Sequence, residues 1–206
     1  TEEEKVDSYQ FSTSIYQNGH LSIEYPLLTQ MGDENKEHQM NELLEQEAIK
    51  YVTQFEDNDT TLNMDHQVII NTQNILSILY IGNYNGGMYP TQLLFTTNIN
   101  LKEGKKIRLS DVFSINERFF EQFKQSPYID WENPSHPNKE KQAAVVEYLN
   151  GINQQELMNA FKQADDPSIE DNPYGIYSYF KEDFLIISIQ VPHALGDHAE
   201  FKMNVE

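Results

Sequence analysis

Two groups of strand-like segments flank a block of short helix-like segments, and this order constrains the fold of the chain more than any other feature. Runs of β-branched and alternating apolar residues predict strands at residues 9–25, 68–70, 75–81, 91–101, 176–180, 184–191 and 201–205. Strands on both sides of a helical block favour an α+β fold, in which helices pack on one face of a mainly antiparallel sheet.

The first strand-like segment predicts a hairpin. Asn18-Gly19 lies between two alternating runs, and this pair tolerates the positive φ angles of a tight turn. Pro26 is expected to close the second strand. Residues 35–55 then carry apolar side chains at three- and four-residue spacing, which predicts the longest helix, followed by a polar loop at residues 56–61.

Three short helices are predicted in the second half of the chain. A capping box from Ser114 to Glu117 opens the first, which ends before Pro127. Pro137 suits the first turn of the next helix, which ends at Gly151. A third begins near Asn153 and ends before the acidic residues 165–166, where we expect a solvated helix terminus rather than a loose calcium site.

The net charge of the chain limits the classes of molecule that it can be expected to bind. Fourteen Lys and Arg residues stand against 33 Asp and Glu residues, giving a formal net charge of −19. Nucleic acids and anionic membranes require a basic face, so neither is expected as a partner. The charge favours either solubility alone or attraction of a basic protein, whose binding would weaken as salt is added.

Length and cysteine content limit the architecture and the chemistry. A chain of 206 residues can bury a core without disulfides, and residues 9–206 are expected to form one domain with room for two lobes, about 9–82 and 83–206. Residues 1–8 are interpreted as an acidic tail or linker. The absence of cysteine excludes disulfides, thiolate catalysis and cysteine-based metal sites. The chain begins with Thr1, which suggests a signal peptide, anchor or cloning boundary upstream.

His193 and His198 form the densest polar group, together with Asp197. Imidazoles and a carboxylate on one connection between strands could bind zinc or transfer protons. The spacing matches no metalloprotease pattern, and a third ligand would have to come from elsewhere. We therefore interpret the segment as a turn shaped by Gly196-Asp197, and predict no metal and no cofactor.

The most distinctive loop contains Tyr84, Gly86, Gly87 and Tyr89. Paired glycines permit unusual backbone angles, and exposed tyrosines beside them could stack on a sugar ring or anchor a protein interface. A plain hairpin connection is the competing interpretation. Trp131, in a Pro-rich stretch, has the same two interpretations, as a binding residue or as part of a plain connection.

Several enzyme and metal signatures are missing from the sequence. The calcium-loop-like start at Asp57 lacks the required Gly and Glu, and no G-x-S-x-G elbow or phosphate-binding loop is present. Glycoside hydrolysis needs two carboxylates across a cleft, and 33 acidic residues leave too many candidate pairs to select one.

Two stretches resemble a known family. Residues 21–44, a strand followed by a helix, look like the amino-terminal part of the extracytoplasmic module of PdaC-like deacetylases. Residues 84–113, with a Gly-Gly loop, a strand, a Leu-x-x-Gly-Lys turn and a Leu-x-Asp-Val-Phe segment, resemble the domain of unknown function that follows it. Together they resemble the RsiV/PdaC-like extracytoplasmic domain, the ectodomain type of lysozyme-sensing anti-sigma factors.

The resemblance implies an α+β domain on the outer face of a Gram-positive-type cell, secreted or membrane-anchored. From it, and from the charge and the tyrosine loop, we expect a non-catalytic module that recognises a protein, such as a basic one like lysozyme, or a cell-wall glycan. The alternative is a polysaccharide hydrolase that uses paired carboxylates. The ligand-contacting residues predicted for the module are Tyr84, Gly86, Gly87, Tyr89, Trp131, His193 and His198.

Overall fold

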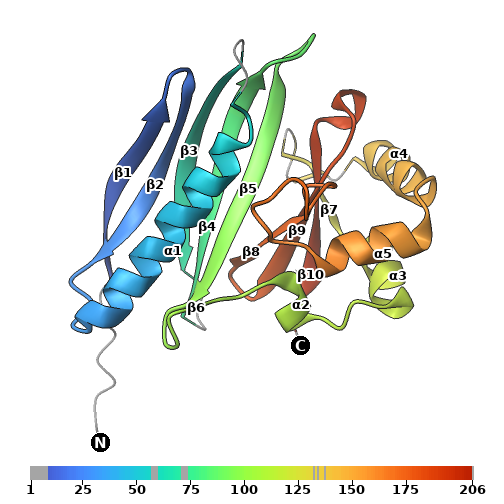
Figure 1. The fold of residues 1–206 in the computed structure, drawn as a ribbon. Helices are drawn as coiled ribbons and strands as arrows, with labels where there is room; N and C mark the ends of the chain where they lie inside the picture. The colour runs from blue at the N-terminus through green and yellow to red at the C-terminus, as the bar shows by residue number, and fades with distance from the viewer. Residues whose placement is uncertain are drawn as a thin grey trace, which may run out of the picture.

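The strands are divided between a six-stranded and a four-stranded sheet (Figure 1). The computed structural model describes residues 9–56, 60–70, 74–131, 133, 135–136 and 138–205. The first sheet has the order β1-β2-β3-β4-β5-β6 and the second the order β7-β10-β9-β8. An α+β fold built on mainly antiparallel strands is therefore confirmed, although the strands form two sheets.

The first sheet contains the predicted hairpin and the predicted meander. Its strands are β1 (Gln10–Asn18), β2 (Leu21–Thr29), β3 (Thr61–Ile70), β4 (Ile75–Asn85), β5 (Thr91–Asn100) and β6 (Lys105–Lys106). Gly19 has a φ of 59°, as the hairpin turn requires. The prediction that Pro26 ends the second strand is wrong, since β2 runs on to Thr29. Pro26 is tolerated because β3 pairs only with Leu21–Ile23, so no ladder bond from the proline nitrogen is needed on that side.

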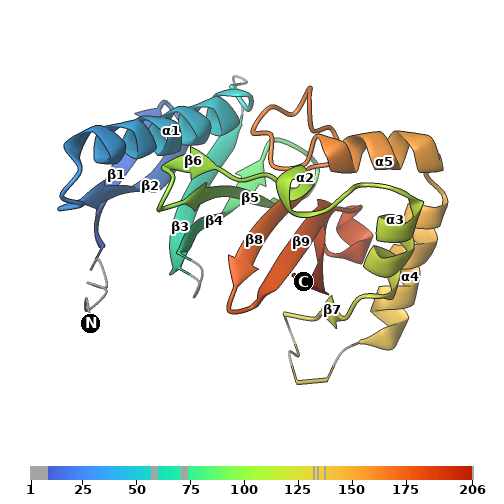
Figure 2. The same cartoon turned by 90° about the horizontal axis from the view of Figure 1, so that it is seen from below.

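Helix α1 (Glu34–Thr53) connects β2 to β3 and covers one face of the first sheet (Figures 1 and 2). β2 and β3 are parallel, and parallel neighbours require such a crossover. The Asp33 side chain accepts a hydrogen bond from Lys36 N and so caps the helix. The buried residues of the helix face the sheet: Met40, Leu44, Glu47, Ala48, Tyr51 and Val52.

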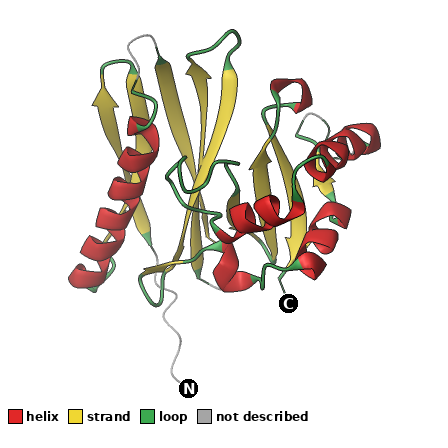
Figure 3. Ribbon diagram, turned by 45° about the vertical axis from the view of Figure 1, so that its right-hand side comes forward, coloured by secondary structure: helices red, strands yellow, loops and turns green. Residues whose placement is uncertain are grey.

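The second sheet packs against the remaining helices (Figure 3). Its strands are β7 (Tyr128–Ile129), β8 (Tyr177–Lys181), β9 (Phe184–Gln190) and β10 (His198–Asn204). The helices are α2 (Leu109–Val112), α3 (Glu117–Gln125), α4 (Lys139–Asn150) and α5 (Gln154–Lys162). Phe123 and Phe161 meet edge to face at 4.9 Å, and Phe123 also contacts Phe201 of β10 at 4.6 Å. Aromatic side chains thus form the centre of this second core.

The two sheets meet where the edge strand β8 lies against β4 and β5. Thr96 Oγ1 and Asn98 Nδ2 donate to the carbonyl oxygen of Ser178, at 2.6 and 2.8 Å. Ser77 Oγ accepts from Phe180 N at 2.9 Å. Buried backbone groups need partners, and here side chains of the first sheet satisfy the edge of the second.

Two predicted helix and strand boundaries are wrong. The N-cap of α3 is Asn116, whose side chain accepts from Phe119 N, and not Ser114. β10 begins at His198 rather than at residue 201, so His198 belongs to a strand while His193 begins the short 3-10 helix η1 (His193–Leu195). Both differences arise because sequence periodicity defines the middle of an element better than its ends.

The change of sheet falls between β6 and β7, whereas the sequence-based boundary near residue 82 lies inside β4. Each sheet has its own apolar core, but Tyr177, Tyr179 and Ile186 of the second sheet belong to the core of the first. Among the described residues, no helix combines the length and the apolar character that a membrane span requires.

Candidate binding site at the open end of the two sheets

His198 links the two sheets at the end of the molecule where the β4–β5 connection lies. Its Nδ1 lies 2.5 Å from Glu200 Oε1, and its Nε2 lies 2.8 Å from Oε1 of Gln92 on β5. Both ring nitrogens are therefore engaged in hydrogen bonds. The imidazole therefore connects β10 to β5. Neither of its nitrogens is free to bind a metal.

Glu200 is a buried carboxylate whose two oxygens are both hydrogen-bonded. Oε1 pairs with His198, and Oε2 accepts from the indole nitrogen of Trp131 at 2.7 Å. A buried carboxylate without such partners would be strongly destabilising. Burial, with a contribution from the Glu200 charge, raises the pKa of the neighbouring Tyr179 above its ordinary value. Trp131 is thereby fixed in orientation while much of its ring stays exposed.

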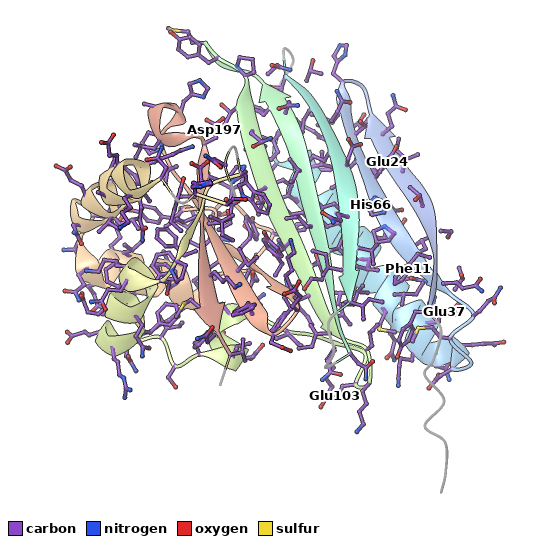
Figure 4. All side chains as sticks on the ribbon, turned by 180° about the vertical axis from the view of Figure 1, so that it is seen from behind. Phe11, Glu24, Glu37, His66, Glu103 and Asp197 are labelled. Carbon is purple, nitrogen blue, oxygen red and sulfur yellow. The ribbon has the colours of Figure 1, made fainter. Side chains whose placement is uncertain are left out.

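Asp197 makes the second link between the sheets, and Figure 4 shows it at their junction. Its Oδ2 accepts from the backbone nitrogen of Gln92 at 2.9 Å, and its Oδ1 lies 2.9 Å from His193 Nδ1. Gly196 has a φ of 104° and Asp197 a φ of 69°, so these two residues shape the turn, as their sequence suggested. The turn aims the carboxylate at β5.

Tyr89 completes the group from the β4–β5 connection. Its ring stacks on His193 with centroids 5.5 Å apart and planes 3° apart. Met88, Tyr89 and Trp131 are 88, 59 and 49% exposed. We call Met88, Tyr89, Trp131 and His193 the aromatic end. Hydrogen bonds and ring stacking thus bring together four predicted site residues, Tyr89, Trp131, His193 and His198.

The other predicted residues of the loop take no part in these hydrogen bonds and ring contacts. Tyr84 packs on Phe55 at the end of α1, with ring centroids 5.2 Å apart. A Cβ added to Gly86 would come within 2.3 Å of the Tyr84 hydroxyl oxygen, so any larger residue there would require the Tyr84 side chain to move. Gly87 faces open space, with its nearest contact at 4.0 Å. Neither glycine has a positive φ, so the unusual backbone angles expected from the pair are absent.

A pocket of about 340 Å³ opens beside the aromatic end, between α1, β5 and the segment that precedes β8. Gln54 at the end of α1 holds that segment, since its Nε2 donates to Pro167 O at 2.7 Å and its Oε1 accepts from Ile169 N at 2.5 Å. Figure 2 shows the segment passing the end of α1. Asp197 and His198 form part of the pocket wall.

Sequence reasoning missed most of the pocket because its lining comes from distant segments. Tyr51, Gln92 and Ser188 line it from α1, β5 and β9. Each belongs to a regular element with an ordinary periodic pattern. The one signal in the sequence was the cluster of Asn, Pro and Gly residues at 172–175, which is typical of a loop.

The described residues contain no group of three or more His, Asp or Glu side chains that could hold a metal ion. The other histidines that could supply a third zinc ligand, His20, His66 and His136, form no such group with His193 and His198. The electrostatic character of the site is that of paired carboxylates and imidazoles that link two sheets.

Comparisons with known proteins identify the fold. The sequence matches no family model and no curated protein. A solved DUF3298 family member from Bacteroides fragilis matches with a TM-score of 0.54 and 13% identity, covering 96% of this chain and 91% of that one. A DUF3298 family protein from Pseudomonas aeruginosa matches with a TM-score of 0.51 and 11% identity, covering 96% and 89%. This chain therefore shares its fold with solved members of a family of domains of unknown function.

Proposed function

We propose that this chain is a non-catalytic extracytoplasmic binding module that recognises a basic protein through its aromatic end. The observation that carries the proposal is the exposure of Met88, Tyr89 and Trp131 at one end of the molecule. The buried Glu200 holds the indole of Trp131, and Tyr89 stacks on His193. Aromatic residues and Met are enriched where proteins bind one another, and rigid anchors lose little entropy on binding. The RsiV/PdaC-like resemblance supports an extracytoplasmic location.

The charge of the chain supports a basic partner. A net charge of −19 produces an attractive field for a positively charged protein and speeds their encounter. Lysozyme is the natural probe, because it is basic and because the resemblance points to a lysozyme-sensing ectodomain. Association with it should weaken as ionic strength rises.

The alternative of a polysaccharide hydrolase receives less support from the site. Asp197 and Glu200 are the carboxylates at this end, and every one of their oxygens already has a protein partner. A general acid or a base must reach the substrate with a free oxygen. We expect no reducing sugar to be released from peptidoglycan, chitin or xylan.

Binding to lysozyme at low and high ionic strength tests the proposal. Tyr89→Ala should weaken the complex about tenfold or more, as loss of an interface anchor does. Ile15→Ala is the matched control, because Ile15 is also an exposed apolar residue but lies on β1, on the opposite edge of the first sheet. The proposal fails if lysozyme does not bind at low ionic strength, or if the two variants bind equally well.

A further inference from the structure

We propose that the pocket beside the aromatic end binds an uncharged sugar, of about disaccharide size, between α1, β5 and the segment before β8. This ligand would be separate from the protein partner, since none of Met88, Tyr89, Trp131 and His193 lines the pocket. Its volume of about 340 Å³ falls within the range of about 300–1,000 Å³ typical of small-molecule sites.

The pocket has an apolar wall suited to the face of a pyranose ring. Phe55, Leu93, Ile169, Pro173 and Tyr177 supply this wall. Two parts of this wall are held in place by other residues. Tyr177 packs edge to face on Phe95 at 5.5 Å, and the segment carrying Ile169 is fixed by its hydrogen bond to Gln54.

Two buried residues that line the pocket carry hydroxyl groups for which the described part of the chain provides no partner. Tyr51 is 4% and Ser188 1% exposed, and both line the pocket. Neither side chain makes a hydrogen bond with another residue in the described part of the chain. The fully enclosed polar atoms that lack partners there are His66 Nδ1, Tyr80 Oη and Tyr179 Oη, so the Tyr51 and Ser188 hydroxyls are not fully enclosed by protein atoms.

Buried hydroxyls are normally hydrogen-bonded, and leaving one unsatisfied is costly. A ligand that both donates and accepts hydrogen bonds would satisfy the two groups. The Gln92 side chain adds further capacity, since only its Oε1 is engaged, by His198. These groups therefore suit a ligand with several hydroxyls.

The charges around the pocket select a neutral ligand. Among the described residues that line it there is no Lys or Arg, so an anion would find no counter-charge there in a chain of net charge −19. Asp197, the one carboxylate among the described lining residues, has both oxygens engaged, so it offers a cation no free partner. A sugar combines hydroxyl groups with an apolar ring face and carries no charge, and this matches both the polar groups and the wall.

Backbone amide NMR spectra of the protein, titrated with cellobiose, xylobiose, maltose and N,N′-diacetylchitobiose, test the proposal. At least one of these sugars should shift the amide signals of Gln92, Ser188 and Tyr177. The variant Tyr51→Phe keeps the ring and its stacking on Phe95 but removes the hydroxyl, and should weaken that sugar about 3- to 10-fold. Ser188→Ala should weaken it similarly.

Tyr80→Phe is the matched control, because it also removes a buried hydroxyl without a partner but does not line the pocket. It should leave sugar binding unchanged. If none of the four sugars shifts the pocket signals, or if Tyr51→Phe and Tyr80→Phe bind a sugar equally well, the proposal is overturned. Lysozyme binding is measured separately, so loss of one ligand leaves the result for the other intact.

Discussion

Asp165 shows how much one side chain can differ from its sequence-based interpretation. The acidic pair that follows α5 was expected at a solvated terminus, but Asp165 is fully buried. Its carboxylate accepts hydrogen bonds from Ser178 N at 2.5 Å, Ser178 Oγ at 2.7 Å and Leu109 N at 2.7 Å. The partners lie far away in sequence, so no local pattern could have revealed them. The same is true of the link between Glu200 and Trp131.

The buried Asp165 should make stability depend on pH. Burial, the largest effect, raises the pKa of this carboxyl to about 6 from 3.8, against the opposing effect of its hydrogen bonds. The folded protein then binds a proton at a pH where the unfolded chain does not, so the contribution of Asp165 to stability falls as pH rises from about 4 to about 6. The fall amounts to about 3 kcal/mol.

Urea denaturation of the wild type and of Asp165→Asn, near pH 4 and near pH 7, checks this dependence. The variant cannot titrate at this position, so its deficit in unfolding free energy should be about 3 kcal/mol larger near pH 4 than near pH 7. Glu170→Gln, an exposed neighbour, serves as the control and should show little such difference. Equal deficits of Asp165→Asn at the two pH values would contradict the assignment.

At the scale of elements, the sequence predicted the long helix and the short helices well but their ends less well. The apolar stripes of α1, α3, α4 and α5 all lie within the predicted segments. Their periodicity reports burial, which extends over many residues. A cap depends on one side chain, and the cap of α3 is Asn116, two residues after the predicted Ser114.

Replacing Asn116 and Ser114 in turn tests which of the two side chains caps α3. Asn116→Ala removes the acceptor for Phe119 N and should lower the free energy of unfolding by about 1 kcal/mol. Ser114→Ala, at the position predicted from the sequence, should change it by less than about 0.5 kcal/mol. Thermal unfolding of both variants measures the difference. A larger loss for Ser114→Ala would show that the capping box forms at Ser114.

At the scale of the whole molecule, the division into two sheets could not be predicted from the sequence. Ser77, Thr96 and Asn98 lie within β4 and β5, where polar residues suggest a solvated face. The structure buries all three, because they satisfy the edge of β8. The candidate site could not be predicted for the same reason. Its loops were recognisable in the sequence, but they come together only because the two sheets pack against each other.

The shared polar contacts should make the two sheets unfold together. Asn98→Ala removes the donor to Ser178 O and the acceptor for Ser77 Oγ, and should cost about 2–3 kcal/mol. Asn83→Ala, at an exposed position of β4, should cost less than about 0.5 kcal/mol. In the wild type, fluorescence of Trp131 beside the second sheet and far-ultraviolet circular dichroism should report coincident transitions. Separate transitions would show two independent units.

The covering of β4 and β5 by β8 also bears on how the protein is made. The first sheet is synthesised before the residues that complete it, since the partners of its buried polar groups, Ser178 and Phe180, come more than 75 residues later in the chain. Contacts between such distant segments form slowly, and an unfinished sheet is open to misassembly in the interval. Strands that are synthesised later therefore determine when the earlier ones reach their native structure.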